Sequence, residues 1–190
     1  KNEKLGKKIY ITGKGRCNLT NDVSAREFFD FVVSNPKFLY GAINAFPPQA
    51  AKDFFEENGL KLKTERGNRV FPASDKASDV TKTLEKVMRE AGVSVRLDTE
   101  VKAIITKDGK VTAVKTDKGT EACDSAVVCT GGMSYPLTGS TGDGYVFAKA
   151  AGHAIVKPRA SLVGIELKDN DIYDLQGLSL KNVSIKAVSD

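Results

Sequence analysis

Ala126-Val-Val-Cys-Thr-Gly-Gly132 is the stretch of the sequence that decides the fold. Its first four residues belong to an apolar run within residues 122–129, a pattern typical of a strand buried in a parallel sheet. Ligands of open α/β sheets bind outside the carboxyl ends of such strands, and a Gly-Gly turn there lets a cofactor approach the backbone. The stretch therefore predicts an α/β domain with a ligand at residues 130–132. The alternative is a strand-to-loop turn that needs glycine only for its backbone angles.

The elements around this stretch alternate between helical and strand patterns, with no internal repeat. Apolar spacing predicts helices, and the long one, capped by Ser74-Asp75, has a single apolar face and ends at Gly92. Alternating residues predict strands, and Lys107-Asp108-Gly109 is a strong hairpin turn. The order favours an α/β domain with a β-meander. We expect helices at 25–33, 37–45, 48–58, 76–91 and 142–152, and strands at 60–64, 68–71, 93–97, 102–106 and 110–116.

Composition excludes several classes of protein. The 29 basic and 24 acidic residues give a net charge of +5, spread along the chain without a basic cluster, so we expect no nucleic-acid partner. No apolar run approaches the roughly 20 residues that cross a bilayer, and no signal peptide is visible. Three cysteines at irregular spacing and one histidine indicate reduced thiols and no metal site. We therefore expect a cytoplasmic protein that acts on a small molecule.

Two further glycine turns could bind an anion. Thr12-Gly-Lys-Gly-Arg-Cys-Asn18 combines backbone N–H groups with two cations, although an ordinary surface turn explains it equally well. Gly139-Ser-Thr-Gly-Asp-Gly144 precedes a helix and suits a phosphate or a ribose, but capping by its hydroxyls or its acid is the structural alternative. Capping leaves the number of glycines unexplained. A complete G-x-G-x-x-G does not occur in the sequence.

Three motifs together resemble one family of proteins closely. They are Gly13-Lys-Gly-Arg-Cys-Asn-Leu-Thr-Asn21, Arg69-Val-Phe-Pro-Ala-Ser-Asp-Lys-Ala-Ser-Asp79 and Thr130-Gly-Gly-Met-Ser-Tyr-Pro-Leu-Thr-Gly-Ser-Thr-Gly-Asp-Gly144. In identity and order they are similar to the bacterial NAD(P)/FAD-dependent flavoproteins of the BaiN or aminoacetone-oxidase type. The resemblance covers nearly the whole chain. It implies a glutathione-reductase-type FAD-binding domain with an inserted β-rich domain.

The resemblance also implies which residues surround the cofactor. Val101 would meet the adenine through its backbone, and Tyr135 and Arg69 would lie on the substrate side. FAD would be the cofactor, with NAD(P)H as a co-substrate, and no catalytic acid or base stands out. The residues expected to line the FAD are Lys8, Thr12, Gly13, Gly15, Arg16, Cys17, Asn18, Val101, Thr130, Gly131, Gly132, Ser140, Thr141, Gly142 and Asp143.

The function that follows is an FAD-dependent oxidoreductase whose flavin is reduced by NAD(P)H or by the substrate. A non-catalytic anion-binding module and a small-amine oxidase are the alternatives. Both ends suggest a fragment: a partial FAD-binding domain at residues 1–160 and the beginning of a β-rich domain at 161–190. By the resemblance, the G-x-G-x-x-G turn and the closing flavin-binding segment would lie outside this stretch. We therefore expect the isolated chain to hold little FAD and to be inactive.

Overall fold

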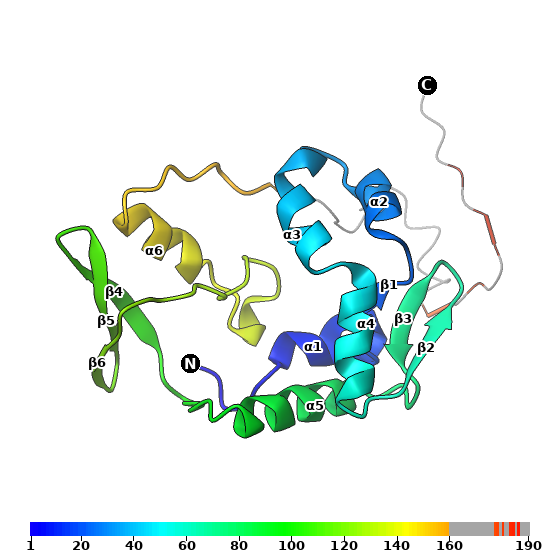
Figure 1. Cartoon of the computed structure of the whole chain (residues 1–190), viewed down its shortest axis with the longest axis horizontal. Coiled ribbons are helices and arrows are strands. Elements are labelled where there is room, and N and C mark those ends of the chain that lie inside the picture. The colour runs from blue at the N-terminus through cyan, green and yellow to red at the C-terminus, as the bar shows by residue number, and fades with distance from the viewer. Residues whose placement is uncertain (160–176, 179, 181–182, 185, 187–190) are drawn as a thin grey trace. The chain divides into compact units, whose positions relative to one another are not determined.

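A computed structural model describes residues 1–159, 177–178, 180, 183–184 and 186 of the 190-residue chain (Figure 1). The chain divides into two compact units, Lys1–Ile155 and Val156–Asp190. The elements below all belong to the first unit. The β-rich character expected from residue 161 onward falls mostly on residues outside the described ones and stays a prediction. Among the helices in the described part of the chain, none is long and apolar enough to cross a membrane.

Short helices fill the first third of the chain. Ser24 begins one of them with a capping box, because its hydroxyl accepts from the Glu27 N–H while the Glu27 carboxylate accepts from the Ser24 N–H. This helix is shorter than the predicted 25–33, because at Phe29 it tightens into a 3₁₀ turn. Pro48 begins the longest helix of this region, as proline at a first helical position should. The elements are α1 (Lys7–Ile11), η1 (Thr12–Gly15), α2 (Ala25–Phe28), η2 (Phe29–Phe31), η3 (Pro36–Leu39), α3 (Tyr40–Ala45) and α4 (Pro48–Glu57).

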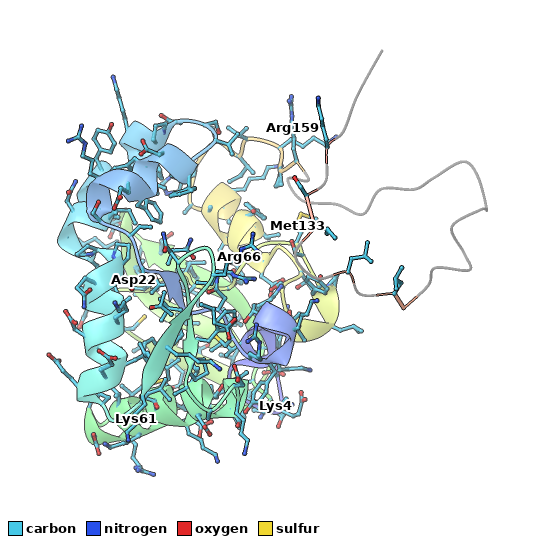
Figure 2. The ribbon with its side chains drawn as sticks, turned by 90° about the vertical axis from the view of Figure 1, so that its right-hand side faces the viewer. Lys4, Asp22, Lys61, Arg66, Met133 and Arg159 are labelled. Atoms are coloured by element: carbon cyan, nitrogen blue, oxygen red, sulfur yellow. The ribbon has the colours of Figure 1, made fainter. Side chains whose placement is uncertain are left out.

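The first sheet has three antiparallel strands, β1 (Thr20–Asn21), β2 (Leu62–Glu65) and β3 (Arg69–Pro72), in the order β1-β3-β2. Both predicted strands of the β2–β3 hairpin are confirmed. Helix α4 packs on this sheet. Asp22, which Figure 2 shows beside α4, accepts hydrogen bonds from Lys52 Nζ at 2.7 Å and from Thr64 Oγ1 at 3.0 Å. This acid therefore joins the sheet to the helix.

Helix α5 (Ala77–Glu90) confirms the predicted long amphipathic helix and contacts both α1 and β3. The expected cap at Ser74-Asp75 is absent, because Lys76 is the N-cap and no side chain caps the helix; the Ser74 hydroxyl accepts from the Lys76 N–H at 3.3 Å, ahead of the first turn. The core lies where this helix meets the sheet. Val70, Phe71 and Val80 are at most 1% exposed. Cys17 packs with Leu60, Ala77 and Val80 in the same core.

The second sheet is the predicted meander, with strands β4 (Val101–Lys107), β5 (Lys110–Thr116) and β6 (Gly119–Ala122) in sequence order. Figure 1 shows it as a separate sheet, with no strand shared with β1–β3. Asp108 and Gly109 both have positive φ angles, 51° and 75°, as a two-residue hairpin turn requires. The hairpin prediction is confirmed. After it come η4 (Pro136–Thr138) and α6 (Asp143–Ala150), which confirms the last predicted helix.

Two predicted strands are absent from this part of the chain. Residues 93–97 and the segment after β6, including 126–129, have no ladder of hydrogen bonds. Val127 is 89% exposed, so the prediction of a buried parallel strand there is wrong for this structure. The physical reason is that a parallel strand needs flanking strands, and all strand pairs among the described residues are antiparallel and lie elsewhere.

Candidate functional site

A cavity of about 590 Å³ lies between the beginning of the chain, the start of β4 and the loops around α6. Its volume falls in the range of small-molecule and cofactor pockets, roughly 300–1,000 Å³. It collects residues that are far apart in the sequence. They are Lys1, Asn2, Gly6, Lys7, Lys8, Thr99, Val101, Cys129, Thr130, Gly131, Gly132, Ser134, Thr138, Gly139, Ser140, Asp143 and Phe147.

About half of the residues predicted to line the FAD lie around this cavity. They are Lys8, Val101, Thr130, Gly131, Gly132, Ser140 and Asp143. Thr141 and Gly142 belong to the same loop without lining the cavity. Met133, labelled in Figure 2, lies close to Gly142: a Cβ built on this glycine would be 3.4 Å from Met133 Cγ. The second and third glycine turns therefore form one rim, while their contact with FAD stays a prediction.

Close packing explains one glycine from each of these two turns. A Cβ on Gly131 would come 2.9 Å from Ser140 Oγ, and a Cβ on Gly144 would come 2.6 Å from Thr130 Oγ1. The turn after residue 129 is thus pressed against the start of α6. The N-cap of α6 is Gly142, which makes no side-chain capping bond. The capping interpretation of this turn is therefore wrong, since the Thr141 hydroxyl donates to Asp143 Oδ1 instead.

The cavity wall carries more positive than negative charge. Lys1, Lys7 and Lys8 line it together with one acid, Asp143; Lys1 is paired with Asp143 and Lys7 with Glu3 outside the wall, so Lys8 is the wall lysine that no acid pairs with among the described residues. The hydrogen bond from Lys1 Nζ, at 2.5 Å, is the main reason that the pKa of the Asp143 carboxyl lies below its ordinary value, and the Thr141 hydroxyl lowers it further. Asp143 is therefore ionised at neutral pH. Net positive charge around a glycine-rich rim favours a phosphorylated or otherwise anionic ligand.

Lys8 links two parts of the cavity wall. Its ammonium donates to the Ser134 carbonyl oxygen and lies 5.3 Å from the centre of the Tyr135 ring. Tyr135 has φ 53° and ψ 68°, an uncommon backbone conformation for an aromatic residue that precedes proline. Its carbonyl accepts from both the Thr138 N–H and the Thr138 hydroxyl, which holds this conformation. Arg69, the other residue expected on the substrate side, instead lies on β3 and donates to the Arg66 carbonyl.

The first glycine turn lies outside the cavity. Thr12, Gly13, Gly15, Arg16, Cys17 and Asn18 are absent from its wall. Cys17 is only 6% exposed, and burial raises the pKa of its thiol. The Arg16 guanidinium is ion-paired with Glu65 and Asp75. The predicted flavin contacts of this turn stay predictions, and its arginine has partners within the protein.

The glycine turn has a strained backbone. Four of its residues have positive φ angles: Gly13 at 55°, Lys14 at 56°, Gly15 at 84° and Cys17 at 63°. Lys14 and Cys17 carry side chains, and each such residue costs on the order of 1–3 kcal/mol unless its surroundings hold it. Contacts of the turn with Glu65 of β2 and with Asp75, just after β3, help to hold this conformation.

Sequence reasoning missed several residues of the wall. Asn2 donates from Nδ2 to the Thr138 carbonyl at 2.9 Å, and a Cβ on Gly139 would come 2.7 Å from that nitrogen. Phe147, 8% exposed, closes the wall from α6. The helical spacing of α6 could have identified Phe147 as an inward-facing residue. Nothing in the local pattern around Asn2 points to a contact 136 residues away. In the described part of the chain, no three His, Cys, Asp or Glu side chains gather to hold a metal.

Residues 1–189 match a protein family described as the HI0933-like protein Rossmann domain. The chain belongs to this family. The match confirms the resemblance that the three motifs indicate, to FAD-binding flavoproteins of the BaiN and aminoacetone-oxidase type. It also supports a Rossmann-like class for the fold, although the described strands of the chain are all antiparallel.

Three curated relatives are similar over nearly all of the chain. A 3-dehydro-bile acid delta(4,6)-reductase of Clostridium scindens is 30% identical over 93% of this chain and 42% of its own length. The ribosomal RNA dihydrouridine synthase of Haemophilus influenzae is 29% identical over 94% of this chain and 45% of its own length. The ribosomal RNA dihydrouridine synthase of Escherichia coli is also 29% identical, over 93% of this chain and 43% of its own length. The chain thus spans less than half the length of these relatives.

Proposed function

We propose that this chain is the cofactor-facing part of an FAD-dependent reductase that adds hydrogen to a carbon–carbon double bond. The observation that carries the proposal is the cavity wall, which joins two glycine turns to three lysines and one acid. Glycines let a cofactor approach the backbone, and Lys8, which no acid pairs with among the described residues, would attract a dinucleotide's phosphates. When bound, the flavin would supply the hydride transfer, and the protein would orient it.

The reaction class comes from two kinds of relative. One printed name is a delta(4,6)-reductase and the other is a dihydrouridine synthase, and both describe products with a double bond removed. Such a reduction adds a hydride to one carbon and a proton to the other, and it consumes a reduced cofactor. We propose NAD(P)H as the source of the electrons. A small unsaturated carbonyl compound is the proposed substrate, since the +5 charge is spread along the chain instead of clustered for RNA.

The flavin of the purified full-length protein tests this function. Its absorbance should bleach without oxygen on addition of NADH or NADPH, and a small α,β-unsaturated ketone should restore it faster than buffer alone. Bleaching by a small amine but by neither nicotinamide would favour the amine oxidase. Restoration by a uridine-containing RNA but not by the ketone would assign the substrate to RNA.

A further inference from the structure

The Arg16 side chain does not line the cavity and contacts β2, β3 and the loop just after β3. Its Nη1 atom lies 2.8 Å from Glu65 Oε1 and 3.2 Å from Asp75 Oδ1, so two carboxylates share it. One face of the guanidinium lies over the ring of Phe71, 4.1 Å from the ring centre. Phe71 is 1% exposed and therefore fixed in the core. The arginine is held by three residues of the protein itself.

These contacts join two of the sequence motifs into one unit. The motif at 13–21 supplies Arg16, and the motif at 69–79 supplies Phe71 and Asp75. The backbone continues the connection, because the Leu19 N–H donates to the Val70 carbonyl at 2.9 Å and β1 pairs with β3. A Cβ on Gly13 would come 2.9 Å from Phe71 Cε1. The strained turn is therefore held by the contacts of the Arg16 side chain, by the backbone pairing that follows the turn, and by the close packing of Gly13 against Phe71.

Lys14 has a different place in the turn. Its side chain is exposed, and no ion pair or hydrogen bond joins it to another residue in the described part of the chain. The two cations of the motif therefore differ: Arg16 is ion-paired with residues of the protein, and Lys14 is exposed to solvent. Only the second is available to an anion.

We infer that Arg16 is a positioning residue: its contacts with Glu65, Asp75 and Phe71 lock the strained 12–18 turn, which lies outside the cavity wall and which the motif resemblance assigns to the cofactor. This inference rests on the proposed FAD function. It gives the arginine of the motif a role other than binding a phosphate. It also assigns Glu65 and Asp75, two acids outside the cavity, an indirect effect on the affinity for FAD.

Neutralising Glu65 and Asp75 distinguishes a positioning role of Arg16 from a direct phosphate-binding role. In a Glu65→Gln, Asp75→Asn variant, a positioning arginine loses its partners, so the dissociation constant for FAD should rise roughly tenfold, as it should in Arg16→Gln. Combining all three changes should add little, because the changes break one interaction network. If Arg16 instead binds a phosphate of FAD, the dissociation constant of the double variant should fall, because removing two negative charges tightens the binding of an anion.

The experiment titrates FAD into the flavin-free full-length protein and follows flavin fluorescence. Arg96→Gln is the matched control, because it breaks an exposed ion pair with Glu121 outside the site, and it should leave the affinity unchanged. Circular dichroism checks that each variant is folded. Unchanged or tighter binding by the double variant would overturn the inference.

Hydrogen exchange keeps the test independent of FAD binding. The Arg16 and Cys17 N–H groups donate to carbonyls within the turn, to Gly13 and Thr12. They should exchange faster in the double variant than in the wild type while the core amides stay protected. Equal protection would overturn the inference even where a variant binds FAD poorly. If the wild type binds no FAD but the amides of the turn still exchange faster in the double variant than in the wild type, the proposed function is wrong and the locking contacts are supported.

Discussion

Gly13 lies directly against Phe71: a Cβ on this glycine would come 2.9 Å from Phe71 Cε1 and 2.8 Å from the Asn18 nitrogen. The φ angle of Gly13 is 55°, which disfavours a side chain. Both the backbone conformation and the space therefore require glycine. The fixed ring of Phe71 cannot give way, because it is buried in the core.

Gly13→Ala should lower the free energy of unfolding by about 2–4 kcal/mol, from backbone strain plus overpacking. Chemical denaturation measures the change. Gly109→Ala is the matched control, because φ there is 75° but no atom lies within 4 Å of the added Cβ. This control should lose only about 1 kcal/mol. Equal losses in the two variants would show that Phe71 is not a close neighbour of the turn.

Gly144→Ala tests the contact between the two glycine turns of the cavity. Alanine in a helix is ordinarily better than glycine by up to about 1 kcal/mol. Here the new Cβ would come 2.6 Å from Thr130 Oγ1, so we expect the variant to be less stable than the wild type. In a Thr130→Ala background most of this loss should disappear, because the remaining close atom, Val128 Cγ1, would be 3.3 Å from the added Cβ. A stabilising effect in the wild-type background would contradict the packing of residue 130 against α6.

The three cysteines should react with a thiol reagent in a fixed order. Cys129 is exposed, Cys123 is half-buried and Cys17 is buried. Burial raises the pKa of the Cys17 thiol, which lowers the fraction of reactive thiolate at neutral pH. Mass spectrometry of partially alkylated protein should find Cys129 modified first and Cys17 last. Early modification of Cys17 would place this turn at the surface.

Acid should weaken the contacts of Arg16. Hydrogen bonds from Arg16 lower the pKa of Glu65, and those from Lys63 and Arg16 lower that of Asp75. A carboxyl group whose pKa is lower in the folded state stabilises the fold above its unfolded pKa, about 4, and loses that effect as the pH falls through the folded value. Denaturation between about pH 6 and 2.5 should show a smaller loss of stability in the Glu65→Gln, Asp75→Asn variant than in the wild type. Parallel pH profiles would contradict these ion pairs.

Local signals were sufficient for much of this fold. Pro48, the capping residue Ser24 and the Asp108-Gly109 turn each act within a few residues, and the elements they begin or join are present. The strand expected at 126–129 failed because a buried strand depends on neighbours that no local pattern shows. The ion pairs of Arg16 could not be predicted for the same reason, since its partners lie 49 and 59 residues further along. The cavity wall could be predicted in part, because its glycine turns have a recognisable sequence pattern, whereas the sequence around Asn2 has none.

The flavin content of the purified full-length protein is the most direct test of the proposed function. The account predicts bound FAD with the usual flavin absorbance bands, bleached by NADH or NADPH in the absence of oxygen and restored by an α,β-unsaturated ketone. A colourless full-length protein that binds no added FAD would contradict it.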